Sequence, residues 1–574
     1  MRVLLLHSDD TLPLTRPEPW DLIVDFARTP AAIHESWTKQ VECPVLSLCQ
    51  FAEEITDLYR VRQLQQLGMG YMVGQWGIDW WGVLSLEIVP QLQQFMLVQR
   101  LSKQLSANCE LHSSRPHFLA TALQRLLGAR LTILESRAQS IIHRARRYRD
   151  ASSRLDISQL MQVLEDKFDT DQFIRRHFTR RHTRGQPVIL LPSAYSNVSR
   201  AAISYAKLLP DHQFLLVHAR SNAKLTPLPK NVCSASLTPY FVPTDKGQTE
   251  CLLESWDGLR KHLVHSAEEF KMADAVGVLG RIPALLRWGI ALRDAWNQVF
   301  KSENVTACLC GDDSNPPSSI PLIMAKQRGL PALACHHGAL NYMMAIKVNH
   351  ADCYLVKSEM ELDYLRRICH VAPEKLVMAA AVRAWPLQKA ARHPAPWLVF
   401  FTEPYQNYGW RSDEVYRDLL PRLCALAQSC GLKLVFKLHP FESVKGHRRM
   451  LRRLIPEREH QIGVLAGPPS DQMWNRTRLA LTVQSSTALE CDALDIPVFL
   501  CAWLRDPYSG YVQQYARFGV GHVLESEEQI ADIPRLLAND EKMSHQRACS
   551  TVIDSDDFAA LLSGTFSLPV ASNA

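Results

Sequence analysis

The sequence predicts an α/β protein made of two facing Rossmann-like domains and a smaller α/β domain at the amino end. Short runs rich in leucine and β-branched residues alternate with longer helical patterns along nearly the whole chain, which is typical of parallel sheets with helices on both faces. A length of 574 residues exceeds what one hydrophobic core supports, so several domains are expected. A proline-rich stretch at 386–396 interrupts both periodicities and predicts a hinge between two domains.

The composition is that of an ordinary globular protein, with 47% apolar and 21% charged residues, and it excludes a disordered or fibrous class. The 64 basic and 58 acidic residues give a net charge of +6, which is too near balance over this length to indicate a nucleic-acid partner. The 15 cysteines are scattered, without C-x-x-C pairs or metal-ligand spacing. We therefore expect reduced thiols in the core.

Neither a signal peptide nor a membrane span is expected. The apolar run at 3–6 is short and is followed by Asp9 and Asp10, whereas a signal peptide needs a longer apolar stretch. No window reaches the roughly 18 uncharged apolar residues of a membrane span. The prediction is a cytoplasmic protein that is at most peripheral to the inner membrane.

The first domain is expected at 1–135. Its predicted strands lie at 2–7, 21–25, 44–48 and 131–134, with a helix at 90–105. A helical connector at 136–185 follows and is rich in arginine. Its basic side chains allow two interpretations, a solvated helix face or contact with anionic lipid or a phosphorylated carrier.

The second and third domains are expected at 186–385 and 396–567. The predicted strands of the second domain lie at 187–191, 214–218, 307–310, 332–335 and 353–356, with a helix at 199–209. Those of the third domain lie at 397–401, 432–438, 479–483 and 498–500. Ligands of open parallel sheets bind beyond the carboxyl ends of the strands, so the residues that directly follow each strand are the candidate site.

Two strand-end loops of the second domain contain candidate catalytic groups. Asp312 and Asp313 follow the strand that ends at Cys310, and a carboxylate there suits a general base that deprotonates an acceptor hydroxyl. Turn formation and helix capping are the alternative roles of these residue types. We expect Asp313 to be the base, because Asp312 directly follows Gly311 and is suited to fixing the turn. His337, after the next strand, is the alternative base.

In the third domain, the ends of two strands predict contacts to a nucleotide. Lys437 is the cation at the end of one strand, and Pro440 stops that strand and directs His439 toward a phosphate in the crevice. Thr402 and Glu403 follow the first strand of the domain. We expect them to face the same crevice.

A further strand of the third domain ends in hydroxyl residues. Ser485, Ser486 and Thr487 follow this strand and open a helix that contains Glu490. Backbone N–H groups and hydroxyls at the amino end of a helix bind anions, although Ser and Thr are also ordinary helix caps. Together with the imidazole of the neighbouring loop, they predict a phosphate site.

These motifs resemble those of a known group. His439-Pro440 and Ser485-Ser486 resemble the His-Pro and Ser-Ser motifs of GT-B enzymes of capsule and lipopolysaccharide synthesis, including bacterial sialyltransferases and Kdo transferases. The stretches GDDSNPPSSIPLIMAKQRGLPALACHHG and ADCYLVKSE also resemble the superfamily of UDP-N-acetylglucosamine 2-epimerases and CDP-glycerol transferases. The resemblance covers roughly 187–504, and the acidic motif is Gly-Asp-Asp here, whereas the sialyltransferases place the glycine last.

The resemblance implies that the His-Pro and Ser-Ser motifs hold the phosphate of a CMP-sugar and that Asp312 or Asp313 is the base. The leading interpretation is a metal-independent glycosyltransferase with a nucleotide sugar as donor, an oligosaccharide or lipid-linked acceptor and no cofactor. We expect no metal because no Asp-x-Asp motif stands out, and because His439, Lys437 and a helix end can meet the charge of the leaving phosphate. The alternatives are a nucleotide-sugar 2-epimerase, a glycerophosphotransferase, and a non-catalytic binding subunit of a polysaccharide assembly complex.

Overall fold

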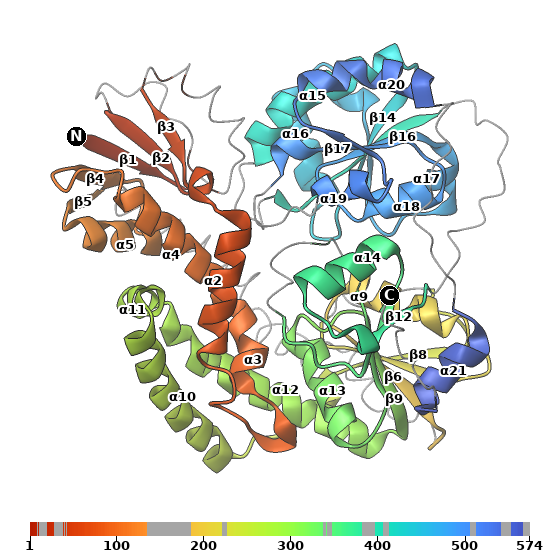
Figure 1. The fold of residues 1–574 in the computed structure, drawn as a ribbon. Coiled ribbons are helices and arrows are strands. Elements are labelled where there is room, and N and C mark those ends of the chain that lie inside the picture. Colours follow the sequence, from red (N-terminus) through yellow and green to blue (C-terminus); the bar gives the residue numbers. More distant parts are fainter. Residues whose placement is uncertain are drawn as a thin grey trace.

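The computed structural model describes residues 1–7, 10, 20–27, 38, 41, 43–134, 185–220, 227–336, 340, 347–380, 396–405, 412–505, 512–540 and 553–565. These residues form three α/β units, each built on one sheet (Figure 1). Nearly all of the predicted connector at 136–185 and of the predicted hinge at 386–396 lies outside the described residues.

All strand pairs within the three sheets are parallel. The first sheet contains β1 (Arg2–Leu6), β2 (Leu22–Asp25), β3 (Val45–Ser47), β4 (Glu110–Ser113) and β5 (Arg130–Ile133). The middle sheet contains β6 (Val188–Ser193), β7 (Phe214–His218), β8 (Val232–Ser236), β9 (Val305–Cys310), β10 (Ala332–Cys335), β11 (Cys353–Val356) and β12 (Leu376–Met378). The last sheet contains β13 (Trp397–Phe401), β14 (Lys433–Lys437), β15 (Gly463–Leu465), β16 (Thr477–Thr482), β17 (Val498–Cys501) and β18 (His522–Leu524).

The three sheets share one strand order. In each, the first strand along the chain lies in the interior of the sheet, the second and third lie on one side of it, and the fourth and fifth lie on the other. This is the order of a Rossmann-like domain, whose ligand crevice lies where the order reverses, between the first and fourth strands. The reversal points are β1/β4, β6/β9 and β13/β16. The strand order confirms the predicted fold class and gives the small first domain the same topology.

Helices connect these strands and cover the sheets. In the first unit they are α2 (Glu54–Gln66), α3 (Trp80–Leu84), α4 (Val89–Ser102) and α5 (Phe118–Leu127). In the middle unit they are α9 (Ser196–Ala206), α10 (Lys246–Ser266), α11 (Glu268–Ala275), α12 (Ile282–Ser302), α13 (Pro316–Gln327) and α14 (Glu359–Asp363). The helices that follow β13 in the sequence are α15 (Ser412–Ser429), α16 (Val444–Leu454), α17 (Asp471–Arg476), α18 (Thr487–Ala493), α19 (Val512–Arg517), α20 (Ile533–Asp540) and α21 (Ser555–Ser563).

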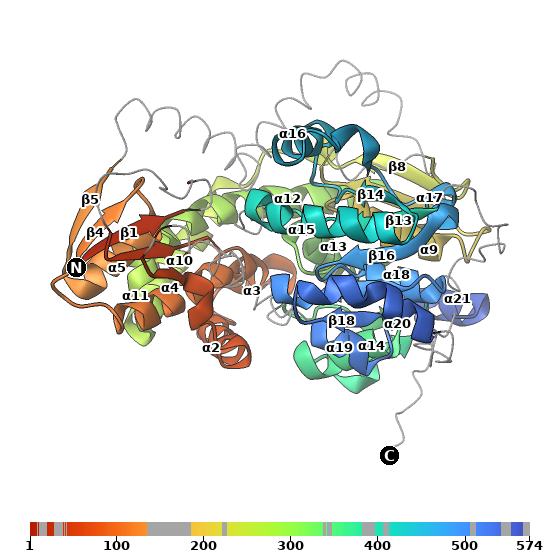
Figure 2. The same cartoon turned by 90° about the horizontal axis from the view of Figure 1, so that it is seen from above.

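The first domain docks on helices α10 to α12 of the middle unit, for which we had predicted no elements (Figures 1 and 2). The Trp81 ring stacks on Trp256 of α10 at 6.3 Å and meets Phe270 of α11 at 5.9 Å. At the edge of this contact, Arg60 donates two hydrogen bonds to the Glu269 carboxylate, at 2.8 and 2.9 Å. Large buried aromatic rings contribute most of the energy of such a contact. The first domain is therefore fixed to the middle unit through its helices.

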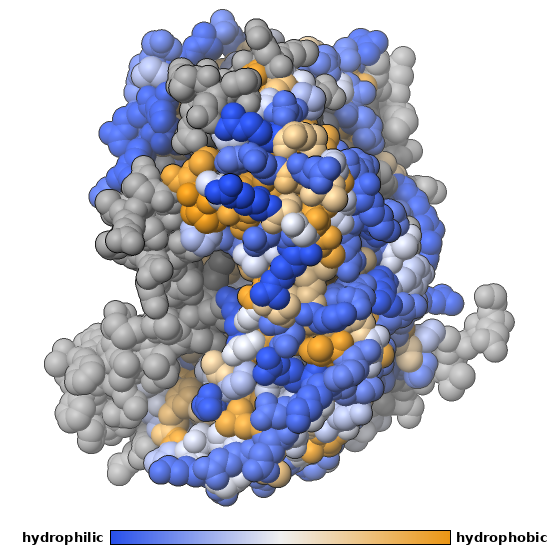
Figure 3. All heavy atoms as spheres, turned by 90° about the vertical axis from the view of Figure 1, so that its left-hand side faces the viewer, coloured by the Kyte–Doolittle hydropathy of each residue, from blue (hydrophilic) through white to orange (hydrophobic). Residues whose placement is uncertain are grey.

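The surface on the side of the first domain is mixed in character. Figure 3 shows hydrophobic residues gathered mainly over the upper part of this side, among hydrophilic ones. Within the described part of the chain, no single helix has the length and apolar content to span a membrane, and the one pair that passes together, Glu268–Ala275 with Leu279–Ser302, is bent by 68°.

The last helix crosses back to the middle unit, although 396–567 was predicted as one domain. Phe558 of α21 packs with Tyr205 of α9 at a ring distance of 5.5 Å, and both belong to the core that covers one face of the middle sheet. The apolar residues Phe558, Leu561 and Leu562 share one face of this helix and are buried there. By its packing, α21 belongs to the middle unit.

Gly311 allows α9 to approach the end of β9 closely. A Cβ at this position would lie 2.2 Å from the carbonyl oxygen of Val198 in α9, far inside van der Waals contact. Only glycine fits where a helix backbone meets a strand end this closely. The residue that opens the Gly311-Asp312-Asp313 motif is therefore required by the packing of the reversal point.

Candidate functional site

The carboxyl-end loops of the middle and last sheets face each other (Figure 1). Arg200 of α9 lies with Nη2 3.7 Å from Oε1 of Glu490 on α18, and the Tyr195 ring lies 6.0 Å from the Phe441 ring, edge to face. Both contacts join a loop or helix after β6 to one after β14 or β16. The exposed ion pair adds little stability, but these contacts define the two walls of the candidate cleft.

The loop after β14 presents the imidazole of His439. The backbone N–H of Phe441 donates to Nδ1 of this ring at 3.2 Å. A nitrogen that accepts a hydrogen bond has no proton, so the neutral ring has its proton on Nε2. This tautomer leaves an N–H group suited to donating to a phosphate oxygen.

Thr402 and Glu442 hold that loop in place. The Glu442 carboxylate accepts from the backbone N–H of His439 at 3.0 Å and from the Thr402 hydroxyl, whose oxygen also accepts from the His439 N–H at 3.0 Å. Burial raises the pKa of the Glu442 carboxyl to about 7. Glu442 was not among our predicted site residues, although it lies only three positions after His439.

Lys437 is the buried cation at this strand end. Its Nζ donates to the carbonyl oxygen of Leu438 at 2.9 Å. Burial, and then the positive charge of Arg200, lower its pKa to about 8, while Glu490 and Glu442 oppose the shift. A nearby anion such as a phosphate would stabilise the charged form of this side chain.

Glu403 joins the loop of β13 to the loop of β16. Its Oε1 accepts from the backbone N–H of Gln484 at 2.8 Å, and the Glu403 side chain is buried. Thr402 contacts the β14 loop and Glu403 the β16 loop, one on each side of β13. His439 and Ser485 therefore stand at strand ends two spacings apart, roughly 9–10 Å.

The three hydroxyl residues after β16 differ in whether their side chains hydrogen-bond to the start of the following helix. Ser485 Oγ accepts from the Thr487 N–H at 3.3 Å, whereas Ser486, the N-cap residue, makes no side-chain capping bond. The helix that follows has only seven residues, so its dipole contributes less than the sequence suggested. Among the described residues, Thr487 Oγ1 and Gln484 Oε1 have no hydrogen-bond partner.

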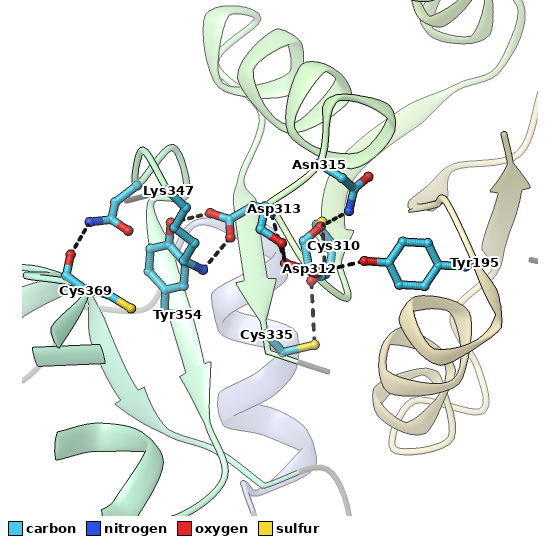
Figure 4. A network of polar contacts seen from close by, with 11 residues as sticks. Tyr195, Cys310, Asp312, Asp313, Asn315, Cys335, Lys347, Tyr354 and Cys369 are labelled. Atoms are coloured by element: carbon cyan, nitrogen blue, oxygen red, sulfur yellow. Dashed lines mark hydrogen bonds and ion pairs between the residues drawn. The ribbon is translucent and has the colours of Figure 1, made fainter. Parts of the chain in front are cut away.

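Asp312 and Asp313, on the opposite wall, point in different directions (Figure 4). Oδ1 of Asp312 accepts from the N–H and the hydroxyl of Ser314 at 2.9 and 2.5 Å, which fixes the turn. Its Oδ2 accepts from the Tyr195 hydroxyl at 3.3 Å. Burial, and then the Asp312 charge, raise the pKa of Tyr195 well above its usual value, so this phenol stays protonated and donates.

Asp313 forms a buried ion pair inside the middle domain. Its carboxylate accepts from Lys347 Nζ at 2.6 Å and from the Tyr354 hydroxyl, and all three side chains are buried. Burial is the largest single effect and lowers the pKa of Lys347, but the charge and hydrogen bond of Asp313, together with smaller effects of Cys369 and Asp312, outweigh it and the net shift is upward. We had expected Asp313 to project past the turn, whereas both its oxygens are engaged with partners 34 and 41 residues away in the sequence.

Of the two adjacent histidines after β10, the structure describes only His336. His336 is buried, its ring lies 6.0 Å from the Tyr364 ring, and its carbonyl oxygen accepts from Lys357 Nζ at 2.5 Å. His337 lies outside the described residues. Among the residues that are described, no group of three or more His, Cys, Asp or Glu side chains is arranged to hold a metal ion.

Tyr195 and Arg200 were not predicted as site residues. Both follow β6, the first strand of the middle domain, just as Thr402 and Glu403 follow β13 in the last domain. The feature of the sequence that could have indicated them is the polar turn that follows β6. The shared strand order now shows that these two loops occupy equivalent places.

Comparisons with known proteins identify similar folds only. No protein-family model matches the sequence, and a search of curated proteins finds no match. Among solved structures, the chain is similar to UDP-N-acetylglucosamine 2-epimerase from Methanocaldococcus jannaschii in complex with UDP-GlcNAc and UDP, at 12% identity and TM-score 0.41, over 66% of this chain and 99% of that one.

Two further solved structures are similar to it. The wall teichoic acid polymerase TagF matches at 10% identity and TM-score 0.39, over 71% of this chain and 99% of that one. MurG from Acinetobacter baumannii matches at 10% identity and TM-score 0.34, over 66% of this chain and 94% of that one. The fold assignment rests on the strand order of this chain.

We predict that Asp313→Asn destabilises the protein by about 3–5 kcal/mol, because it leaves the buried Lys347 cation without a counter-charge. Denaturant unfolding measures the loss. The matched control is Asp274→Asn, which removes a carboxylate from a more exposed ion pair with Arg260 and should cost less than about 1 kcal/mol. A second variant that also carries Lys347→Met should recover much of the stability. Equal small losses in Asp313→Asn and the control would contradict a structural role for the buried pair.

Proposed function

We propose that the protein is a glycosyltransferase that moves a sugar from a nucleotide-activated donor to a growing surface polysaccharide or lipid-linked acceptor. The observation that supports this most directly is that the loops after the carboxyl ends of the strands in the middle and last sheets face each other, and we call each set of loops a rim. The rim of the last domain contains an imidazole N–H, a cation and hydroxyls, and the opposite rim contains carboxylates. Donor phosphates and acceptor hydroxyl would thus meet complementary groups.

The last domain supplies groups for the leaving nucleotide. His439 Nε2–H, the Lys437 ammonium and the Thr487 hydroxyl can donate to phosphate oxygens, and none of them requires a metal ion. Donors already aimed at a developing negative charge stabilise the transition state without reorganising. A CMP-sugar is the donor that we favour, as the His-Pro and Ser-Ser motifs suggest.

Asp312 is the carboxylate that we now favour as general base. Both carboxylates are buried and hydrogen-bonded, but Asp312 Oδ2 accepts from the neutral hydroxyl of Tyr195, whereas Asp313 is paired with the Lys347 cation. His337 is the second candidate. A base near the acceptor and a phosphate clamp opposite it are the parts of an in-line sugar transfer. We place the reaction in the cytoplasm, where nucleotide-activated sugars are made.

Nucleotide binding is the first expected outcome. In a thermal-shift screen of CMP, UDP, GDP and CDP, the cognate nucleotide at about 100 times its dissociation constant should add about 2.7 kcal/mol of stability. His439→Ala and Ser485→Ala should each weaken binding by about 1–3 kcal/mol through the loss of a hydrogen bond to phosphate. The exposed His460 and Ser429 of the same domain are the matched alanine controls. Unchanged affinity in both site variants would make those residues structural.

The affinity should also depend on pH through Lys437. Its pKa of about 8 in the unliganded protein means that it is protonated below pH 8 and increasingly neutral above. The bound phosphate favours the charged form, so binding above pH 8 takes up a proton and the affinity falls by up to tenfold per pH unit. Calorimetric titration of the nucleotide across pH 7–10, on the wild type and Lys437→Gln, measures this. The same pH profile in both proteins would exclude Lys437 as its origin.

If Asp312 is the base, replacing it should lower turnover without weakening nucleotide binding. Asp312→Asn keeps the shape of the side chain but removes its basicity, so turnover should fall roughly 100-fold while nucleotide binding survives. Tyr195→Phe should shift the acidic limb of the pH–rate profile upward, because the Asp312 carboxylate loses a hydrogen bond that favours ionisation. Full turnover of Asp312→Asn together with an inactive His337→Ala would assign the base to the histidine. Conversion of the donor without any acceptor would indicate an epimerase instead.

A further inference from the structure

Helix α16 begins five residues after His439 and is strongly basic on the outside. Its eleven residues include five lysines and arginines and no acidic residue. The helix packs on the last domain through His447, Met450 and Leu451, which are buried. The His447 ring lies 5.2 Å from Tyr416 and 4.9 Å from Phe436. The helix is therefore a fixed part of the domain, at its edge in Figure 2.

The cations of this helix fall into two sets. Arg448 pairs with Glu459 at 3.2 Å, and Arg453 pairs with Asp413, so these two are neutralised within the domain. Lys445, Arg449 and Arg452 are exposed and form no ion pair with any described residue. The spacing of four and then three residues places these three on one stripe of the helix. A single face thus presents three uncompensated positive charges.

Two exposed apolar side chains lie at the amino end of the helix, near the first of these charges in the sequence. Phe441 is 49% exposed and Val444 is 40% exposed. Phe441 also contacts Tyr195 across the cleft, so this end of the helix lies at the mouth of the candidate site. Apolar residues beside lysines and arginines are typical of helices that lie in a lipid interface. A soluble polyanion would account for the charges but not for the exposed apolar surface of Val444 and of the half-exposed Phe441.

We propose that the basic face of α16, defined by Lys445, Arg449 and Arg452 together with Phe441 and Val444, docks on a membrane surface that contains anionic lipids. The charges are attracted to the lipid headgroups, and the two apolar side chains enter the headgroup region. Docking through this face brings the mouth of the cleft to the membrane surface. The proposal is independent of which reaction the cleft performs.

The test uses the full chain and vesicles of phosphatidylcholine, alone or mixed with phosphatidylglycerol, in a co-sedimentation assay. The wild type should bind the mixed vesicles, bind neutral vesicles far less, and release as salt is raised. Replacing Lys445, Arg449 and Arg452 together by glutamine should weaken binding on the order of 100-fold, at about fivefold per cation. Val444→Ser should weaken it further without changing the salt dependence.

The matched control replaces Lys246, Lys261 and Lys301, which are exposed on α10 and α12, by glutamine and lowers the net charge by the same amount. It should bind the mixed vesicles like the wild type. Both triple variants should keep the wild-type melting temperature and nucleotide response, which separates this test from that of the proposed function. Equal binding of the two triple variants would overturn the proposal. So would a wild type that binds soluble polyphosphate but no vesicle, because the partner would then be a polyanion.

Discussion

The parallel pairing of every strand in the three sheets is the constraint from which the rest of the structure follows. Parallel strands end at one common edge, and the shared strand order creates one reversal point in each sheet. Two of these edges face each other and are joined by Tyr195 with Phe441 and by Arg200 with Glu490. Polar residues that are far apart in the sequence therefore gather where the two domains meet, because their strands are parallel.

Most polar groups at these edges hold the loops in shape. A buried charge must be paired or hydrogen-bonded, since its desolvation is otherwise costly. Asp313 satisfies this requirement with Lys347, and Glu403 does so with the backbone of Gln484. Lys437 and His439 differ from these in chemical type, because each presents N–H donors that suit a phosphate: a cation whose pKa is lowered by burial, and an imidazole whose Nδ1 accepts a hydrogen bond. This contrast separates the frame of the site from the groups suited to bind a ligand.

The sequence predicted the interior strands well, and several of them, such as β7, β11 and β13, have the predicted limits. Those strands are mostly buried runs of leucine, valine and aromatic residues. The edge strands β8, β12, β15 and β18 were missed because they are short or only partly buried and show no hydrophobic periodicity. The interior strand β4, only four residues long with a charged first residue, was missed as well. The helices α10 to α12 were missed too, and so was the return of α21 to the middle domain, because both depend on packing between distant segments.

At the candidate site, the sequence identified the correct strand ends but not the direction of each side chain. Asp312 and Asp313 are neighbours of the same type, and nothing local distinguishes them. Lys347 and Tyr354 decide the matter, since they bind the second carboxylate in the interior of the domain and leave the first beside Tyr195. Both side chains are buried, but once the second aspartate neutralises the buried lysine, only the first has an oxygen directed toward Tyr195. The division of roles between the two adjacent carboxylates is thus a consequence of charge pairing in the interior.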